Sequence, residues 1–264
     1  MSDKMFDFDS IRRSWRARFA PTFGPPPEEL PPEREVSHQI PLIDETMRYG
    51  NRIRTKCPES LFEQLREKVD RYCKAGWWRP ATGTDAMPLL CIEKKNGTLR
   101  TVVDARLRNA NTFLDVTPLP DLDMIRDRFA RAKFRSKIDM TDAYEQIRII
   151  PEDVWKTLFA CPLGTFESLT LQQGDCNGPS TFQRLMTWVF RTKLGTWVFV
   201  YIDDIFVFTD SFEEHEEALE YVLTCLRRER LFISDVKFFP YTVKEGFWAS
   251  KKLKTTQGKG IFLA

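Results

Sequence analysis

Two adjacent aspartates, Asp203 and Asp204, interrupt an apolar run at residues 198–208. The flanking segments are rich in β-branched and aromatic residues, so the run predicts a β-hairpin with the aspartate pair at its tip. Asp-Asp is a poor tip, because hairpin turns favour Asn and Gly residues that tolerate a positive φ. Adjacent carboxylates on apolar strands repel each other and call for a cation, and Mg²⁺ prefers such oxygen ligands. The pair therefore indicates a metal site, with an acidic solvated turn as the alternative.

A third carboxylate, Asp139, follows an apolar segment that predicts a strand. If this strand and the hairpin belong to one sheet, all three carboxylates meet at one edge. Such a group can hold two divalent ions about 3.5–4 Å apart, as nucleases and polymerases do. The sequence contains neither a P-loop nor a protein-kinase motif, which excludes those two classes.

Helices must support these strands. Apolar residues recur at helical spacing within residues 57–80, 121–134 and 211–230. Ser211 is the expected N-cap of the last helix, with acidic residues in the first turns and basic ones in the last. We expect His215 to lie on the charged, solvated face of this helix.

A second hairpin is predicted from residues 86–93 and 99–103, with Asn-Gly at its turn. It places Lys94, Lys95 and Arg100 on one exposed ribbon. Because helices alternate with hairpins rather than with single strands, the pattern favours an α+β fold over a doubly wound sheet.

The N-terminal segment, residues 1–35, has a different composition. An arginine-rich, amphipathic patch is followed by a proline-rich stretch, which predicts a disordered or linker segment. The alternative for the patch is a short helix that touches nucleic acid. The folded unit is expected to begin near Val36 with an edge strand.

The composition narrows the class of protein but indicates no specific function. The chain has 264 residues with 42% hydrophobic and 30% charged residues, as in globular proteins. A net charge of +2 neither supports nor excludes a nucleic-acid partner. Six scattered cysteines and only two histidines argue against a zinc site and for a reducing compartment. The sequence has no signal peptide and no apolar run long enough to span a membrane, so we expect an intracellular protein without a membrane partner.

The sequence resembles the reverse transcriptase domain of gypsy-type LTR retrotransposon polyproteins and, more distantly, retroviral reverse transcriptases. The resemblance is collinear over about residues 31–250 and includes six blocks. These blocks read IEKKNGTLRTVVDARLRN, TPLPDLD, FRSKIDMTDAYEQIRI, LQQGDCNGPSTFQRLM, FVYIDDIFVF and LFISDVKFF. The Tyr-x-Asp-Asp box within apolar strands is a specific marker of the family.

This resemblance implies the fingers and palm of a right-hand polymerase, with the palm a ferredoxin-like antiparallel sheet that has helices on one face. The implied segments are a disordered or linker region at 1–35, fingers at 36–107 and 151–180, palm at 108–150 and 181–251, and a frayed tail at 252–264. The family's primer grip corresponds to GFWASKK within the second palm segment, a degenerate match. No thumb or RNase H sequence follows, so we expect a piece of a polyprotein or a truncated or decayed copy.

The implied activity is that of an RNA-directed DNA polymerase, which transfers a deoxynucleotide to a primer 3′-hydroxyl on an RNA or DNA template. By the resemblance, Asp139, Asp203 and Asp204 would hold two Mg²⁺ ions, with Mn²⁺ as an alternative. The backbone carbonyl of Met140 would share in metal binding.

The resemblance also implies binding residues. Lys94, Lys95 and Arg100 would grip the triphosphate of the incoming nucleotide. Tyr144 would exclude a 2′-hydroxyl and so select deoxynucleotides, and Gln173 would line the nucleotide pocket. The implied template or primer residues are Phe182, Gln183 and Tyr201.

The implied partners are an RNA/DNA primer–template, dNTPs and other parts of a retrotransposon polyprotein, in cytoplasmic virus-like particles or in the nucleus. Two alternatives stay open: a catalytically idle remnant of the polymerase fold that binds only nucleic acid or protein, and a two-metal nuclease. Intact aspartates and Tyr144 favour an active polymerase over the remnant. The nuclease is the weaker alternative, because His38 and His215 are far in sequence from the aspartates.

Overall fold

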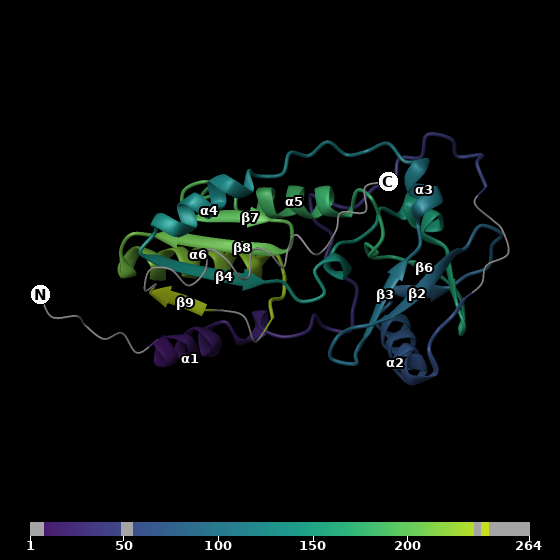
Figure 1. The fold of residues 1–264 in the computed structure, drawn as a ribbon, viewed down its shortest axis with the longest axis horizontal. Helices are drawn as coiled ribbons and strands as arrows, with labels where there is room; N and C mark the ends of the chain where they lie inside the picture. Colours follow the sequence, from purple (N-terminus) through teal and green to yellow (C-terminus); the bar gives the residue numbers. More distant parts are fainter. Residues whose placement is uncertain (1–7, 49–54, 235–238, 243–264) are drawn as a thin grey trace, which may run out of the picture.

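The computed structural model describes residues 8–48, 55–234 and 239–242. Two β-sheets lie at opposite ends of an elongated molecule (Figure 1). The mixture of hairpins and helices confirms the predicted α+β fold. None of the helices within the described ranges is long and apolar enough to cross a membrane.

A five-stranded sheet forms one half of the molecule, in the order β1-β6-β5-β2-β3. Its strands are β1 (Trp78–Pro80), β2 (Met87–Glu93), β3 (Leu99–Val103), β5 (Phe159–Cys161) and β6 (Gly164–Ser168). The predicted β2–β3 hairpin is confirmed, and Gly97 adopts φ 77° at its tip. Helix α2 (Glu59–Lys74) packs its apolar stripe on this sheet, with Leu65 and Tyr72 in one core with Trp78.

A four-stranded antiparallel sheet forms the other half, in the order β7-β8-β4-β9. Its strands are β4 (Phe134–Asp139), β7 (Val198–Tyr201), β8 (Asp204–Thr209) and β9 (Phe239–Thr242). Because strand side chains alternate between faces, Ile138, Val200 and Ile205 share one face. Helices α5 (Gly178–Val189) and α6 (Phe212–Arg228) bury that face in the largest core of the described residues.

The opposite face of this sheet carries α4 (Leu122–Arg131). Ile125 packs there against Phe199, Phe206 and Phe208, which form a separate apolar cluster. The prediction of helices on one face is therefore incomplete. Strand β8 has apolar side chains on both of its faces, so each face needs an apolar layer against it. Helices α5 and α6 cover one face, and α4 covers the other.

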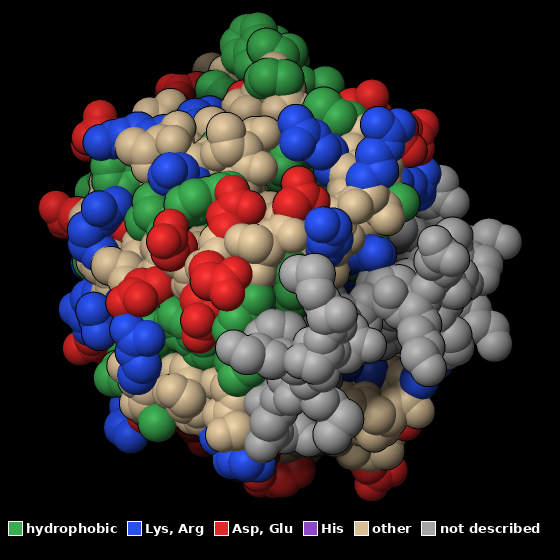
Figure 2. Space-filling model, turned by 90° about the vertical axis from the view of Figure 1, so that its left-hand side faces the viewer, with side chains coloured by type: hydrophobic (Ala, Val, Ile, Leu, Met, Phe, Trp, Pro, Cys, Tyr) green, Lys and Arg blue, Asp and Glu red, His purple; other side chains and the backbone are tan. Residues whose placement is uncertain are grey.

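The end of the molecule away from the five-stranded sheet carries a group of acidic side chains with basic side chains around it (Figure 2). Figure 2 shows Asp and Glu side chains gathered on this face, where α6 begins with Glu213 and Glu214 in its first turn. Such charges favour the positive end of the helix dipole.

The N-terminal part differs from the prediction of a disordered or linker segment at residues 1–35. Within its described residues, α1 (Phe8–Arg18) and the 3₁₀ turn η1 (Ala20–Thr22) lead Trp15 and Phe19 into the core of the four-stranded sheet. The helix is visible in the sequence, because Phe8, Ile11, Trp15 and Phe19 recur at helical spacing.

Residues 23–42, here called the strap, then run along both halves of the molecule. Trp77 donates its indole N–H to the carbonyl of Glu29 at 2.7 Å. Arg34 donates to the carbonyl of Glu229 at 2.7 Å and to that of Gln146 at 2.6 Å. Arg34 thereby satisfies a carbonyl at the C-terminus of α6 that has no partner within the helix. The strap makes only single β-bridges, such as His38↔Ile149, in place of the predicted edge strand.

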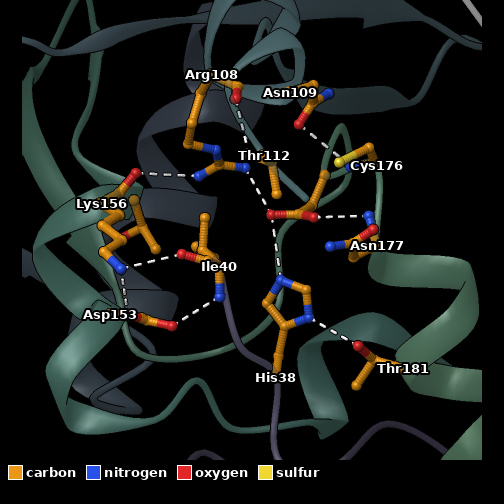
Figure 3. Close-up of polar contacts among 12 residues, drawn as sticks. His38, Ile40, Arg108, Asn109, Thr112, Asp153, Lys156, Cys176, Asn177 and Thr181 are labelled. Carbon is orange, nitrogen blue, oxygen red and sulfur yellow. Dashed lines mark hydrogen bonds and ion pairs between the residues drawn. The ribbon is translucent and has the colours of Figure 1, made fainter. Parts of the chain in front are cut away.

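A buried polar cluster joins the strap to α3 (Arg106–Ala110) and α5 (Figure 3). Arg108 Nη2 lies 2.6 Å from Asp175 Oδ2, and His38 Nε2 lies 3.1 Å from the same oxygen. His38 Nδ1 is 2.9 Å from the hydroxyl of Thr181. Burial alone would raise the pKa of Asp175, but Arg108 and His38 outweigh it and hold that pKa well below its usual range.

The residue types Thr181, His38 and Asp175 match a hydrolase triad, but their setting is structural. All three side chains are buried, and the carboxylate is shared with Arg108. The backbone N–H of Asn177 donates to the other oxygen of Asp175 at 2.9 Å. The cluster therefore fixes the loop that leads into α5.

We predict that Arg108→Leu destabilises the protein by about 3–5 kcal/mol, because it leaves the buried Asp175 without its main counter-charge. The control is Arg106→Leu in the same helix. The side chain of Arg106 is 81% exposed in its pair with Asp104, whereas that of Arg108 is 1% exposed. The control should cost less than about 1 kcal/mol. Urea unfolding measures both, and equal losses would contradict a structural role for the cluster.

The final helix and the remaining connections complete the chain. The 3₁₀ turns are η2 (Tyr144–Gln146) and η3 (Pro151–Thr157). Helix α6 has the predicted cap, since the backbone N–H of Glu214 donates to Ser211 Oγ at 3.2 Å. The predicted degenerate primer grip and the tail at 252–264 lie outside the described residues.

Candidate active site

Strands β4 and β8 bring Asp139 and Asp204 directly opposite each other. Their neighbours Ile138 and Ile205 are buried under α5 and α6. A slip of one residue would turn these apolar side chains to the other face, so burial fixes the register. The ladder therefore holds two like charges face to face at its end, an arrangement that is unfavourable by itself.

The turn between β7 and β8 consists of Ile202 and Asp203, because Tyr201 pairs with Asp204. The predicted tip, Asp203 with Asp204, is wrong by one residue, and Asp204 belongs to the strand. Ile202 adopts φ 54°, which is costly for a β-branched side chain. Backbone strain of this kind occurs often at functional sites.

Two of the predicted template or primer residues are buried on α5, and one of them supports this turn. Gln183 is buried on α5, and its side-chain oxygen accepts a hydrogen bond from the backbone N–H of Ile202 at 3.0 Å. Phe182 is also buried. Their burial does not fit direct contact with a template or primer. Tyr201 is half-buried and precedes the turn.

Lys137 lies between the two opposed carboxylates. Its Nζ is 2.9 Å from Asp204 Oδ2 and 3.5 Å from Asp139 Oδ1. The side chains of Asp139 and Asp204 are 15% and 13% exposed. Among the described residues, no three His, Cys, Asp or Glu side chains form a group that could hold a metal ion. The structure thus has two carboxylates around one ammonium group, with Asp203 in the adjacent turn.

The charges in this cluster shift its pKa values. Burial raises the pKa of Asp204 to about 6; Lys137 opposes the rise, whereas Asp139 and Asp203 add to it. Burial alone would lower the pKa of Lys137, but the two carboxylates outweigh it and raise that pKa. Lys137 therefore remains charged between the two carboxylates.

His215 supports the two strands from the α6 side. Its Nε2 is 2.8 Å from Ser136 Oγ on β4, and its Nδ1 is 2.8 Å from Thr209 Oγ1 on β8. Burial lowers the pKa of His215 to about 4, with Glu214 opposing the shift. The predicted surface position of His215 was wrong. The hydroxyls of Ser136 and Thr209 give the histidine hydrogen-bond partners in the interior, and helical periodicity alone does not reveal such partners.

A pocket of about 340 Å³ opens between α2, β3 and the segment after β4. Four cations line it, together with three carboxylates. The cations are Lys68, Arg71, Lys94 and Arg100, and the carboxylates are those of Glu67, Asp142 and Glu145. The structure therefore brings together two of the three predicted phosphate-binding cations, whereas Lys95 is exposed and does not line the pocket. The sequence analysis missed Lys68 and Arg71, although their spacing by three residues places them on one helical face.

Gln173 lines the same pocket, and its side-chain oxygen accepts a hydrogen bond from Arg100 Nε at 3.1 Å. Its backbone carbonyl accepts one from the N–H of Val103 at 2.9 Å. The next residue, Gly174, has φ 115°, and a Cβ there would lie 2.1 Å from the carbonyl oxygen of Val103. Only glycine allows the loop to approach β3 this closely.

Tyr144 feels charges from both the turn and the pocket. Its ring packs against Phe182, with 6.2 Å between the centroids. Burial raises the pKa of Tyr144, the charge of Asp203 adds to the rise, and Arg100 opposes it. Tyr144 is therefore within electrostatic range of both the turn and the pocket.

Both the sequence and the fold of this chain are similar to those of known proteins. The family model described as reverse transcriptase (RNA-dependent DNA polymerase) matches residues 92–252, which is more than half of the chain. The Pol polyprotein of the gypsy transposon of Drosophila melanogaster is 30% identical over 92% of this chain. The Tf2-3 transposon polyprotein of Schizosaccharomyces pombe is 28% identical over 83% of it. The chain spans only 24% and 17% of these two relatives.

Solved structures give the same fold. The foamy viral protease–reverse transcriptase in complex with double-stranded DNA is similar with a TM-score of 0.76 and 20% identity, over 87% of this chain and 40% of that chain. The same viral protein in complex with an RNA/DNA hybrid gives a TM-score of 0.74 and 20% identity, over 88% of this chain and 31% of that chain. The two halves of the molecule are thus the fingers and palm of a right-hand polymerase.

We predict a pH-dependent contribution of His215 to stability. In the unfolded chain it gains a proton below its ordinary pKa of 6.5, but in the folded protein only below about 4. Its contribution is therefore complete above pH 6.5 and is lost as the pH falls toward 4. Relative to His215→Gln, the wild type should lose about 2–3 kcal/mol between pH 7.5 and 4.5.

Urea unfolding at both pH values measures this difference. The comparison between the two proteins is essential, because the raised pKa of Asp204 has the opposite effect on stability in the same pH range. Equal pH dependence in wild type and His215→Gln would contradict a neutral, buried His215.

Proposed function

This chain belongs to the reverse transcriptase (RNA-dependent DNA polymerase) family, and on that premise we propose that it transfers deoxynucleotides from dNTPs to the 3′-hydroxyl of a primer on an RNA or DNA template. The observation that carries the proposal is the opposed pair Asp139 and Asp204 at the end of β4 and β8. Strand β4 points with this end toward the five-stranded half (Figure 1), which carries the cation-lined pocket. Carboxylates near phosphate-binding cations suit nucleotidyl transfer.

Divalent metal ions fit this donor set, because Asp139 and Asp204 already share a cation, the ammonium group of Lys137. Asp139, Asp203 and Asp204, with the backbone carbonyl of Met140, are the residues that would hold two Mg²⁺ ions, or Mn²⁺ in their place. When bound, such ions activate the attacking oxygen and stabilise the leaving one. The chain itself holds the carboxylates in register through its buried strands.

The pocket between α2 and β3 is the proposed site of the triphosphate. Lys94 and Arg100 of the hairpin face Lys68 and Arg71 of α2 across it. Preorganised cations stabilise the charge that develops on a transferring phosphoryl group. The hydrogen bond from Arg100 to Gln173 orients the guanidinium group before the nucleotide arrives.

The proposed nucleic-acid partner is a primer–template duplex. The similar viral structures hold double-stranded DNA or an RNA/DNA hybrid. We assign Tyr201 beside the carboxylates and the exposed Lys95 on the hairpin tip to contacts with nucleic acid. Such contacts read the sugar–phosphate backbone and the 2′-hydroxyl rather than the base sequence.

The relatives are polyproteins, which supports a role for the chain as one part of a longer assembly. Its proposed place of action is a cytoplasmic virus-like particle, with the nucleus as the second compartment. The fingers would comprise residues 36–107 and 151–180, and the palm residues 108–150 and 181–251.

The first test is Mg²⁺-dependent extension of a DNA primer on an RNA template. We expect extension by the wild type and a loss of at least about a hundredfold for Asp204→Asn, because a carboxylate that positions charge in the transition state is removed. Asp210→Asn is the control, since Asp210 is exposed just beyond the end of the same strand. No extension by a folded wild type, or full activity of Asp204→Asn, would contradict the proposal.

The second test concerns the choice of sugar. Tyr144→Ala should lower the preference for dNTPs over rNTPs, measured as the ratio of kcat/KM values, by about tenfold or more, because space opens for a 2′-hydroxyl. Tyr144→Phe keeps the ring and should keep the preference. If Tyr144→Ala discriminates as well as the wild type, Tyr144 does not select the sugar.

A further inference from the structure

Lys137 stands out as a charged residue of the carboxylate site to which the proposed reaction assigns no role. It lies two residues before Asp139 on β4, so the two side chains share one face of the sheet. On the neighbouring strand it is opposite Phe206, and its ammonium group lies 5.9 Å from the centre of that ring. From this position it reaches Asp204 at 2.9 Å and Asp139 at 3.5 Å.

The contact of Lys137 with the two carboxylates reduces the electrostatic repulsion between them in the metal-free protein. Two opposed carboxylates that are largely shielded from water repel each other strongly. One ammonium group between them supplies the missing attraction. The side chain of Lys137 is 44% exposed, whereas those of Asp139 and Asp204 are mostly covered. Its long flexible stem can therefore move toward solvent while the carboxylates stay in the ladder.

A divalent cation cannot share this position with the ammonium group. Metal binding needs the same carboxylate oxygens, and like charges within a few ångströms repel. We propose that Lys137 is an exchangeable counter-ion, which partly neutralises Asp139 and Asp204 in the metal-free protein and is displaced when a divalent metal binds. This inference rests on the proposed metal-dependent function. Its consequence is that Lys137 weakens metal binding in the absence of nucleotide and nucleic acid.

The test is Mn²⁺ binding to the nucleic-acid-free protein, followed by the electron paramagnetic resonance signal of the free ion. Lys137→Met should bind Mn²⁺ about tenfold more tightly than the wild type, because a competing positive charge is removed. Lys137→Arg keeps the charge and should bind like the wild type. Lys133→Met, which removes an exposed lysine just before β4, controls for net charge and should also leave the affinity unchanged.

A second variant shows where the ion binds and tests stability. Adding Asp204→Asn to Lys137→Met should abolish the gain in affinity. Without metal, Lys137→Met should unfold at a lower temperature than the wild type, and saturating Mn²⁺ should raise its unfolding temperature more than that of the wild type. A merely structural lysine would lower the first temperature without changing the metal response.

The outcomes separate this inference from the proposed function. Suppose that the wild type extends primers but Lys137→Met binds Mn²⁺ no more tightly than the wild type does. The counter-ion role is then wrong and the polymerase function stands. If no variant binds Mn²⁺ and the wild type extends no primer, both proposals fail. Tighter binding by Lys137→Met that Asp204→Asn removes supports both.

Discussion

The rest of the site depends on the cross-strand pairing of Asp139 with Asp204 in the β4–β8 ladder. Hydrophobic burial of Ile138 and Ile205 sets the strand register, and the register in turn forces the two carboxylates together. Repulsion between them then requires a cation. In the metal-free protein Lys137 fills that need, which explains how a sheet can end in two like charges and still be stable.

Buried polar groups hold the strands and loops around this pair. His215 joins β4 to β8 from below, and Gln183 supports the strained turn at Ile202. Further away, Arg108 and His38 share the carboxylate of Asp175 and so fix the loop that presents Gln173 to the pocket. Each of these contacts costs desolvation free energy and fixes the geometry of the groups that it joins. Fixed geometry is useful where side chains must be in position before a ligand binds.

Much of the fold follows from patterns in the sequence. Apolar residues at helical spacing predicted α2, α4 and α6, and alternation with Asn-Gly predicted the β2–β3 hairpin, because in these elements local preference and burial agree. No regular edge strand forms near Val36, because the strap is held by individual contacts with Trp77 and through Arg34 rather than by a ladder of backbone hydrogen bonds. Helix α1 also forms within the segment that was expected to be disordered or a linker. Contacts between residues far apart in the sequence leave no local signal.

The candidate site, like the fold, could be predicted from the sequence only in part. The sequence singled out the three aspartates because carboxylates among apolar strands violate the usual pattern, and the structure places Asp139 opposite Asp204. The turn was misplaced by one residue, since nothing in the sequence favours Ile202 at a positive φ. Lys137 was overlooked, although its spacing from Asp139 already put both on one face. The cross-strand contact to Asp204 required the register, which only the folded sheet supplies.

The most direct measurement is the anomalous scattering of Mn²⁺ in crystals of this chain soaked at saturating concentration. The account predicts an anomalous peak between the carboxylates of Asp139 and Asp204, with the ammonium group of Lys137 moved away from both. A Mn²⁺ ion bound elsewhere, with Lys137 still bridging the two carboxylates, would contradict it.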